Sequence, residues 1–276
     1  MPFDRAIVRP MLDALVYAGL AAAAVTLTRF DGGVACLWVA TAYLISRLTI
    51  IPRREWTAVL LACGGTSLIV SGLWGLGWAA APAVAVINMG EAMVAAMLLR
   101  RSRVEDAPFQ SLAWLSRFVA TIGLAAPLAS ALTGATAAHL ALGAPWAANM
   151  GNWFTGHALG NITFTPIFTL LLRGDVSRWA RDARARQIVE TIVLLGLIVV
   201  TCLGVFAQSD MPLLFLPMLP IILITFRIGR FGAAGAVVIL AVIGGICTLL
   251  DHGPIAAIPV SVGHRVQFFQ FYLAAT

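Results

Sequence analysis

A long apolar stretch of the chain contains two polar side chains, Asn88 and Glu91, with Gly90 between them. Residues three apart share one face of a helix, and a glycine beside them lets another helix approach closely. A carboxylate inside a bilayer costs several kcal/mol unless it is paired, so Glu91 predicts either a bound ligand or proton, or a partner side chain. If the pair only joins helices, Arg117 and Arg47 are the candidate partners.

A second polar pattern runs through the apolar stretch over 147–172. Polar or aromatic residues recur there at steps of four: Asn149, Trp153, His157, Asn161 and Thr165. On a helix of 3.6 residues per turn, such steps place the side chains in a polar seam that turns gradually around the helix and cannot face lipid. Gly156 and Gly160 form a GxxxG pattern beside this seam, which favours close helix contact. The seam predicts a helix inside a bundle, where it either encloses a small polar ligand or provides hydrogen-bonded packing. The candidate ligand-binding residues are Asn88, Glu91, Asn149, Asn152, Trp153, His157 and Asn161.

No other pattern indicates catalysis, a metal site or a cofactor. The sequence contains no Ser-His-Asp set, P-loop, dinucleotide fingerprint or HExxH helix. The four histidines lack the spacing of metal or haem ligands: His139, His157, His252 and His264. The four cysteines are far apart in apolar segments, and we interpret them as small buried hydrophobic residues: Cys36, Cys63, Cys202 and Cys247. We therefore predict no catalytic and no metal residue within 1–276, and the sequence names no cofactor.

The elements that must position these residues are membrane helices. Of 276 residues, 61% are hydrophobic and 11% charged, and the mean hydropathy is +0.94. A water-soluble domain needs more charge than this to cover its surface, so lipid must solvate much of the chain. Apolar runs that can cross ~30 Å of hydrocarbon recur along the whole length. They predict an all-α, polytopic transmembrane bundle of about ten spans: 11–28, 34–51, 56–73, 79–99, 109–142, 147–172, 187–207, 212–227, 231–250 and 264 onward.

The charged residues predict how this bundle is oriented. All 18 basic residues are arginine, and most of them occur in every second connection between the predicted spans. They are Arg5 and Arg9; Arg47, Arg53 and Arg54; Arg100, Arg101 and Arg103; those within 173–186; and Arg227 and Arg230. The positive-inside rule then places both termini in the cytoplasm. The same placement explains the net charge of +6 without nucleic acid as a partner.

Two predicted spans are irregular. The span over 109–142 is longer than the membrane is thick, and Pro127 should kink it. The span over 212–227 has three prolines within nine residues, which should break its outer half: Pro212, Pro217 and Pro220. The arginine-rich segment over 173–187 is interpreted as amphipathic, lying against anionic headgroups.

The two ends of the chain predict its domain organisation. Residues 11–28 are longer than a signal-peptide core and are interpreted as a retained first helix. The last apolar run, from 264, stops after about thirteen residues, too few to span a bilayer. We therefore expect residues 1–276 to be a single integral-membrane domain with a truncated last helix, followed after Thr276 by a cytoplasmic output domain.

Four motifs spread over nearly the whole chain carry a family resemblance. They are Leu-Trp-Val-Ala (37–40) with Ile-Pro-Arg-Arg-Glu-Trp (51–56); Asn-Met-Gly-Glu-Ala (88–92) with Leu-Leu-Arg-Arg (98–101); Trp-Phe-Thr-Gly-His-Ala-Leu-Gly (153–160) with Pro166; and Arg-Ile-Gly-Arg-Phe-Gly-Ala-Ala (227–234) with Gly-Pro (253–254). Together, and in this order, they resemble the first class of bacterial MASE-type membrane-associated sensor domains. The third motif departs from the family pattern, which usually reads Gly-Asp-Ala-Leu-Gly, because His157 occupies the acidic position. A histidine there suits a group that titrates or accepts a hydrogen bond.

The resemblance implies a sensory input domain that controls the module after it. In the family these modules are GGDEF-type diguanylate cyclases, EAL-type phosphodiesterases or histidine kinases, so residues 1–276 are not expected to be an enzyme themselves. The resemblance also implies a location in the bacterial inner membrane and a homodimer formed through the output domain. A small-molecule ligand or a partner membrane protein would supply the signal, and the stimulus itself stays unnamed.

Two other classes of function fit the same residues. A secondary transporter would use the proline-interrupted helix and the polar groups at the membrane midplane, although no internal repeat is visible in the sequence. A membrane scaffold would use the polar groups only for packing, so Glu91→Gln and His157→Ala would alter stability but neither signalling nor transport. A GGDEF, EAL or kinase motif after Thr276 would favour the sensor over both alternatives.

Overall fold

The computed structural model describes residues 2–28, 35, 37–101 and 112–276, with side chains from Val8 onward. Within these ranges the chain is helical and contains no β-strand, which confirms the all-α prediction. Cys36, Arg103 and the first three residues of the span predicted over 109–142 lie outside the described residues.

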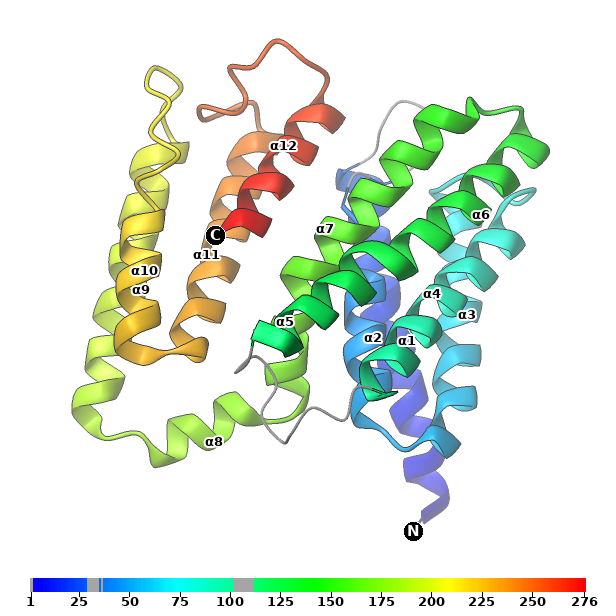
Figure 1. Cartoon of the computed structure of the whole chain (residues 1–276), viewed down its shortest axis with the longest axis horizontal. Helices are drawn as coiled ribbons and strands as arrows, with labels where there is room; N and C mark the ends of the chain where they lie inside the picture. The colour runs from blue at the N-terminus through cyan, green and yellow to red at the C-terminus, as the bar shows by residue number, and fades with distance from the viewer. Residues whose placement is uncertain (1, 29–34, 36, 102–111) are drawn as a thin grey trace. The chain divides into compact units, whose positions relative to one another are not determined.

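The chain folds as two compact units, Met1–Thr169 and Leu170–Thr276, which we call unit 1 and unit 2. The first helices of unit 1 are α1 (Pro2–Leu27), α2 (Ala40–Ile50), the 3-10 turn η1 (Arg53–Glu55), α3 (Trp56–Leu73) and α4 (Ala81–Arg101). They are followed by α5 (Leu112–Phe118), the π-helical stretch η2 (Val119–Ala125), α6 (Ala126–Leu142) and α7 (Trp146–Leu172), within which the unit boundary falls. Unit 2 contains α8 (Asp175–Asp182), α9 (Ala185–Phe206), α10 (Met218–Ile228), α11 (Arg230–Leu249) and α12 (Val262–Ala275) (Figure 1).

Six helical segments among the described residues are long and apolar enough to cross a membrane: Val8–Leu27, Arg53–Leu73, Ala81–Arg101, Leu112–Leu142, Ala185–Phe206 and Arg230–Leu249. Each of the six coincides with one of the ten predicted spans. By length and composition, these segments agree with the predicted helical membrane domain. α7 is 27 residues long. Its polar residues give it a lower mean hydropathy than the six candidate spans, so it is not among them.

The spans predicted over 34–51 and 212–227 form helices of only 11 residues each, α2 and α10. At 1.5 Å per residue, such a helix covers roughly half of the hydrocarbon thickness. α10 begins at Met218, after the first two of the three prolines, as the loss of backbone donors there predicts. α2 is shorter than predicted because residues 37–39 form a non-helical segment that lies against α7.

The segment Leu112–Leu142 runs continuously through a π-helical stretch rather than as one regular α-helix. The π-helical residues Val119–Ala125 end just before Pro127, which lacks the backbone donor that a regular turn would use. The irregularity predicted from the proline therefore takes the form of widened turns on its N-terminal side.

α4 is the central helix of unit 1, because it contacts α2, α3 and α6. Three alanines on α4, Ala92, Ala95 and Ala96, are completely buried. Small side chains allow several helix backbones to approach one helix closely. This packing places the polar residues of α4, one turn away, at the centre of the unit.

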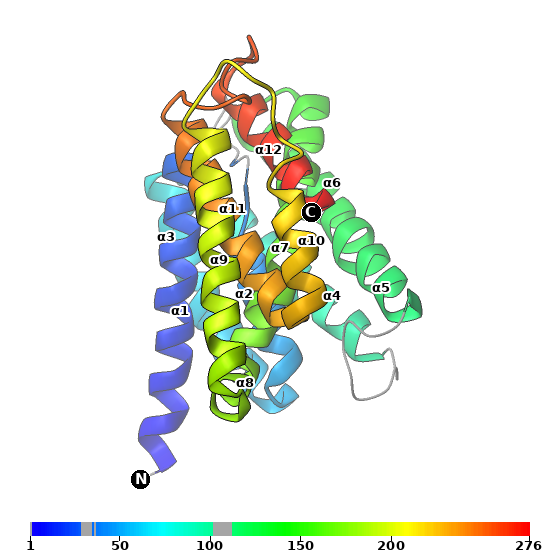
Figure 2. The same cartoon turned by 90° about the vertical axis from the view of Figure 1, so that its left-hand side faces the viewer.

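Unit 2 is held together by an apolar core. α9, α10 and α11 lie side by side, and α12 packs on α11 (Figures 1 and 2). Phe206, Phe269 and Tyr272 form an aromatic cluster with ring centroids 5.8 to 6.4 Å apart. Of the predicted buried cysteines, Cys202 lies in this core and Cys63 in the core of unit 1, which confirms the prediction for both, while Cys247 is half-buried.

Candidate functional site

Glu91 of α4 lies at the centre of a buried hydrogen-bond cluster in unit 1. Its side chain is completely buried, and each carboxylate oxygen has a partner on α7. His157 Nδ1 lies 2.6 Å from Glu91 Oε2, and Asn161 Nδ2 donates to Oε1 at 2.8 Å. One hydrogen therefore lies between His157 Nδ1 and Glu91 Oε2. His157 and Asn161 reach the same carboxylate because they are four residues apart, on one face of α7.

The partners expected for Glu91 if the pair only joined helices were wrong. Arg47 donates instead to Asp13 of α1, with Nε 2.9 Å from Oδ2, and Tyr43 donates to the other oxygen of Asp13 at 2.6 Å. Arg117 occupies an exposed position on α5. Glu91 is thus paired with a neutral amide and an imidazole, which can change its charge, rather than with a permanently charged guanidinium.

The imidazole of His157 is stacked between two indole rings. The Trp38 ring lies 5.6 Å away at 12°, and the Trp153 ring lies 5.2 Å away at 20° on the other side. Each indole is fixed by its own N–H group, Trp38 donating to Thr41 at 2.8 Å and Trp153 to Ser130 at 3.2 Å. The two indole faces therefore hold the plane of the imidazole ring in position.

Residues 37–39 bring Trp38 into the site by lying directly on the glycines of α7. The backbone N–H of Trp38 donates to the carbonyl oxygen of Gly156 at 3.3 Å. A Cβ added to Gly160 would lie 2.5 Å from the carbonyl oxygen of Trp38. The GxxxG pattern therefore serves a close contact, as predicted, but its partner is a non-helical segment rather than another helix.

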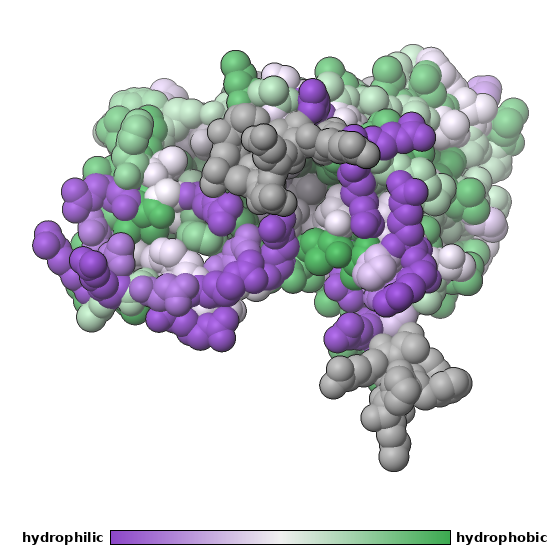
Figure 3. Space-filling model, turned by 60° about the horizontal axis from the view of Figure 1, so that its bottom comes forward, coloured by the Kyte–Doolittle hydropathy of each residue, from purple (hydrophilic) through white to green (hydrophobic). Residues whose placement is uncertain are grey.

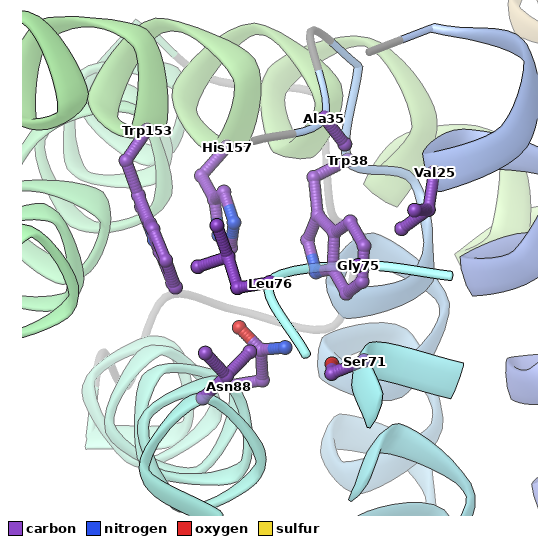
Figure 4. Close-up of a pocket in the computed structure, with 10 residues that line it drawn as sticks. Val25, Ala35, Trp38, Ser71, Gly75, Leu76, Asn88, Trp153 and His157 are labelled. Carbon is purple, nitrogen blue, oxygen red and sulfur yellow. The ribbon is translucent and has the colours of Figure 1, made fainter. Parts of the chain in front are cut away.

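A cavity of about 30 Å³ adjoins this sandwich. Trp38, Trp153 and His157 form one wall (Figure 4). The other residues that line the cavity are Val25, Ala35, Ser71, Gly75, Leu76, Val84 and Asn88. A volume of roughly 10–15 Å³ admits one water molecule, so the cavity holds a solute of only a few heavy atoms.

Asn88 supplies the cavity with a hydrogen-bond acceptor. Its Nδ2 donates to Ser67 at 3.3 Å, whereas its buried Oδ1 has no partner among the described residues. In Figure 4 this oxygen points toward His157 and Leu76. A buried amide oxygen without a partner costs free energy, which a ligand that donates a hydrogen bond would recover.

The structure brings five of the seven candidate residues together. Asn88, Trp153 and His157 line the cavity. Glu91 contacts His157, and Asn161 donates a hydrogen bond to Glu91. The other two, Asn149 and Asn152, are on α7 but do not line the cavity. Sequence reasoning about chemistry missed Trp38 and Ser71, which also line it.

The signals for those two residues differ. Trp38 lies within a motif of the family resemblance, although nothing marked its side chain as part of a site. Ser71 lies in an apolar helix and gives no signal in the sequence. Among the described residues, no three His, Cys, Asp or Glu side chains come close enough to hold a metal ion together.

Comparison with known proteins agrees with the resemblance in the motifs. The MASE1 family model matches residues 11–276, nearly the whole chain. No curated protein and no solved structure matches the sequence. MASE1 domains are membrane-associated, sensory and non-catalytic parts of signalling proteins. The chain therefore belongs to the MASE1 family of membrane-associated sensor domains.

Proposed function

We propose that this domain senses a small polar solute that binds in the cavity beside His157. The observation that carries the proposal is the unpartnered, buried Oδ1 of Asn88, which points into a cavity walled by the Trp38–His157–Trp153 stack. A ligand that donates a hydrogen bond to this oxygen would satisfy it. Glu91 already holds Nδ1, so the ligand would meet His157 through Nε2.

The charge on His157 is the second part of the proposed response. A ligand that binds the two charge states of His157 unequally shifts their populations, whereas one that binds both equally transmits nothing. Protonation of the ring would convert the hydrogen bond to Glu91 into an ion pair between two completely or almost completely buried side chains. The strength of the contact between α4 and α7 would change with it.

The proposed output is a module that follows Thr276 in the cytoplasm and makes or degrades cyclic-di-GMP or acts as a histidine kinase. The arginines of alternate connections support an arrangement with ten crossings of the bacterial inner membrane and both termini inside. The output module would be dimeric. α7 supports a direct route for the signal, because it holds His157 in unit 1 and continues into unit 2 at Leu170.

The test is to measure the output activity of the full-length protein in membranes after substitution of cavity residues. We expect Asn88→Ala and His157→Gln to change basal or stimulated activity several-fold. Asn152→Ala is the matched control, because it removes an amide from α7 that does not line the cavity. Membrane insertion of each variant is checked by fractionation.

Two results would overturn the proposal. Unchanged output activity in both cavity variants, with normal insertion, would remove the sensing site and leave the polar cluster as packing. Solute uptake by proteoliposomes that contain the purified chain, abolished by the same substitutions, would indicate a transporter instead.

A further inference from the structure

We propose that unit 2 carries a binding site for the phosphate of an anionic phospholipid, formed by arginines around Asp175. Arg173, Arg178 and Arg230 all pair with this one carboxylate, and we call these three residues the α8 arginine cluster. Asp175 is buried, at 6% exposure. The cluster lies outside the cavity of unit 1 and takes no part in the function proposed above.

The cluster has more donors than its own carboxylate can use. The Arg173 and Arg230 guanidiniums approach Asp175 Oδ2 at 3.7 and 4.0 Å, while Arg178 donates to Oδ1. Three guanidiniums offer several times more N–H donors than one carboxylate accepts. Their side chains remain 40% to 57% exposed. Donors are therefore left for a second anion, and planar guanidiniums suit a phosphate because they can bind it bidentately.

The surroundings of the cluster are strongly basic. Four helix ends meet there, because Arg230 at the start of α11 reaches Asp175 of α8, and Arg227 at the end of α10 pairs with Glu190 of α9 at 2.5 Å. Residues 173–190 and 227–230 contain seven arginines and three carboxylates, an excess of four positive charges. Hydrophilic residues gather along α8 and the helix ends beside it (Figure 3).

The position of α8 in the chain favours a lipid as the source of the phosphate. Only Ala183 and Arg184 separate α8 from α9, a candidate membrane span whose apolar side chains are largely exposed. α8 must therefore lie near the membrane surface at that end of α9, at the depth of the headgroups. Trp179 of α8 packs on Phe231 at 5.8 Å, and a half-buried tryptophan is typical of the membrane interface.

The experiment uses the whole purified chain in a neutral detergent, with dioctanoyl phosphatidylglycerol as the probe. The thermal unfolding midpoint is followed as the lipid concentration rises, which gives an apparent Kd. We expect phosphatidylglycerol to raise the midpoint, and dioctanoyl phosphatidylcholine and inorganic phosphate at equal concentrations to leave it unchanged. Arg178→Gln with Arg230→Gln should weaken the apparent affinity roughly thirtyfold, or about fivefold for each arginine.

Two further variants keep the test decisive. Arg53→Gln with Arg54→Gln removes the same charge from exposed positions in unit 1, and its affinity should match that of the unchanged protein. If the cluster double variant does not fold, Arg178→Gln alone alters the most exposed member of the cluster and should still show the fivefold loss.

Three outcomes would overturn the proposal. Equal stabilisation by phosphatidylglycerol and phosphatidylcholine would mean that headgroup charge is not recognised. An equal loss of affinity in the unit 1 control would show a general effect of net charge. Stabilisation by inorganic phosphate alone, lost in the cluster variant, would assign the site to a free anion instead of a lipid.

Discussion

Unit 1 and unit 2 are both built from apolar helices, but they hold their charged groups in opposite places. Unit 1 buries Glu91, His157 and Asp13 within its helix packing. Unit 2 holds its charges near helix ends, where the buried Asp175 lies among half-exposed arginines, and its centre contains apolar side chains such as Phe206 and Phe269. Buried charge is costly in a membrane protein and surface charge is not. The difference supports the two proposals made above, a ligand site in unit 1 and a phospholipid site in unit 2.

The largest expected effect comes from removal of the buried carboxylate. Glu91→Ala leaves His157 and Asn161 without their acceptor, and we expect the free energy of unfolding to fall by about 3–5 kcal/mol. Glu190→Ala in unit 2 removes a half-exposed carboxylate paired with Arg227, and should cost less than about 1 kcal/mol. Denaturant unfolding of the purified protein in detergent measures both, and equal losses would contradict the comparison.

A charge in the middle of a unit 2 helix should be the next most costly change. Val193 lies well inside α9 and is 63% exposed. Val193→Arg should lower the membrane-inserted fraction, because an arginine near a helix centre costs about 2.5–3.5 kcal/mol on insertion scales. Val193→Leu is the control and should insert normally. Equal insertion of the two variants would mean that this face of α9 does not contact lipid.

A smaller effect is expected where unit 2 is most tightly packed. A Cβ on Gly244 would lie 2.5 Å from the Phe269 ring and 3.1 Å from Phe206, whereas on Gly245 it would lie 3.6 Å from Phe269. Overpacking of this kind costs about 1–3 kcal/mol, so Gly244→Ala should lower the thermal unfolding midpoint. Gly245→Ala should leave it nearly unchanged, and a reversed order of the two would show that the core of unit 2 is not closely packed.

The smallest expected effect concerns the indole hydrogen bond of Trp38. Trp38→Phe keeps an aromatic ring beside His157 but removes the N–H donated to Thr41, a net loss of about 0.5–1.5 kcal/mol. In a Thr41→Ala background the same substitution should cost less, because its partner is already absent. The free energy of unfolding is measured for the unchanged protein, the two single variants and the double variant. If the losses of the two single variants add up to the loss of the double variant, the hydrogen bond between Trp38 and Thr41 does not stabilise the stacked rings.

Much of the fold could be predicted from composition and periodicity, because lipid forces the backbone into helices whatever the neighbouring segments are. The prediction differed from the structure where local geometry competes with hydropathy. Residues 34–51 read as one apolar span, yet α2 begins only at Ala40, since residues 37–39 lie against Gly156 and Gly160. A hydropathy window cannot detect a contact between segments more than a hundred residues apart.

The site was predicted only in part, for a similar reason. The spacing of His157 and Asn161 gave their shared face, because a helix repeats every 3.6 residues. The spacing could not predict which side chain they contact. In the structure Glu91 pairs with these two residues of α7 rather than with Arg47 or Arg117. Trp38 joined the site through a non-helical segment, for which the sequence has no comparable rule.

By itself, the sequence determined that this chain is a helical membrane domain, which buried polar residues its helices carry, and where its arginines cluster. These properties follow from composition and from the fixed repeat of the helix. Only the tertiary structure decided which polar residues meet: Glu91 with His157 and Asn161, Trp38 and Trp153 on either face of the imidazole, and three arginines on Asp175. Such meetings depend on how helices distant in sequence rotate and pack against one another, and one-dimensional spacing does not record that rotation.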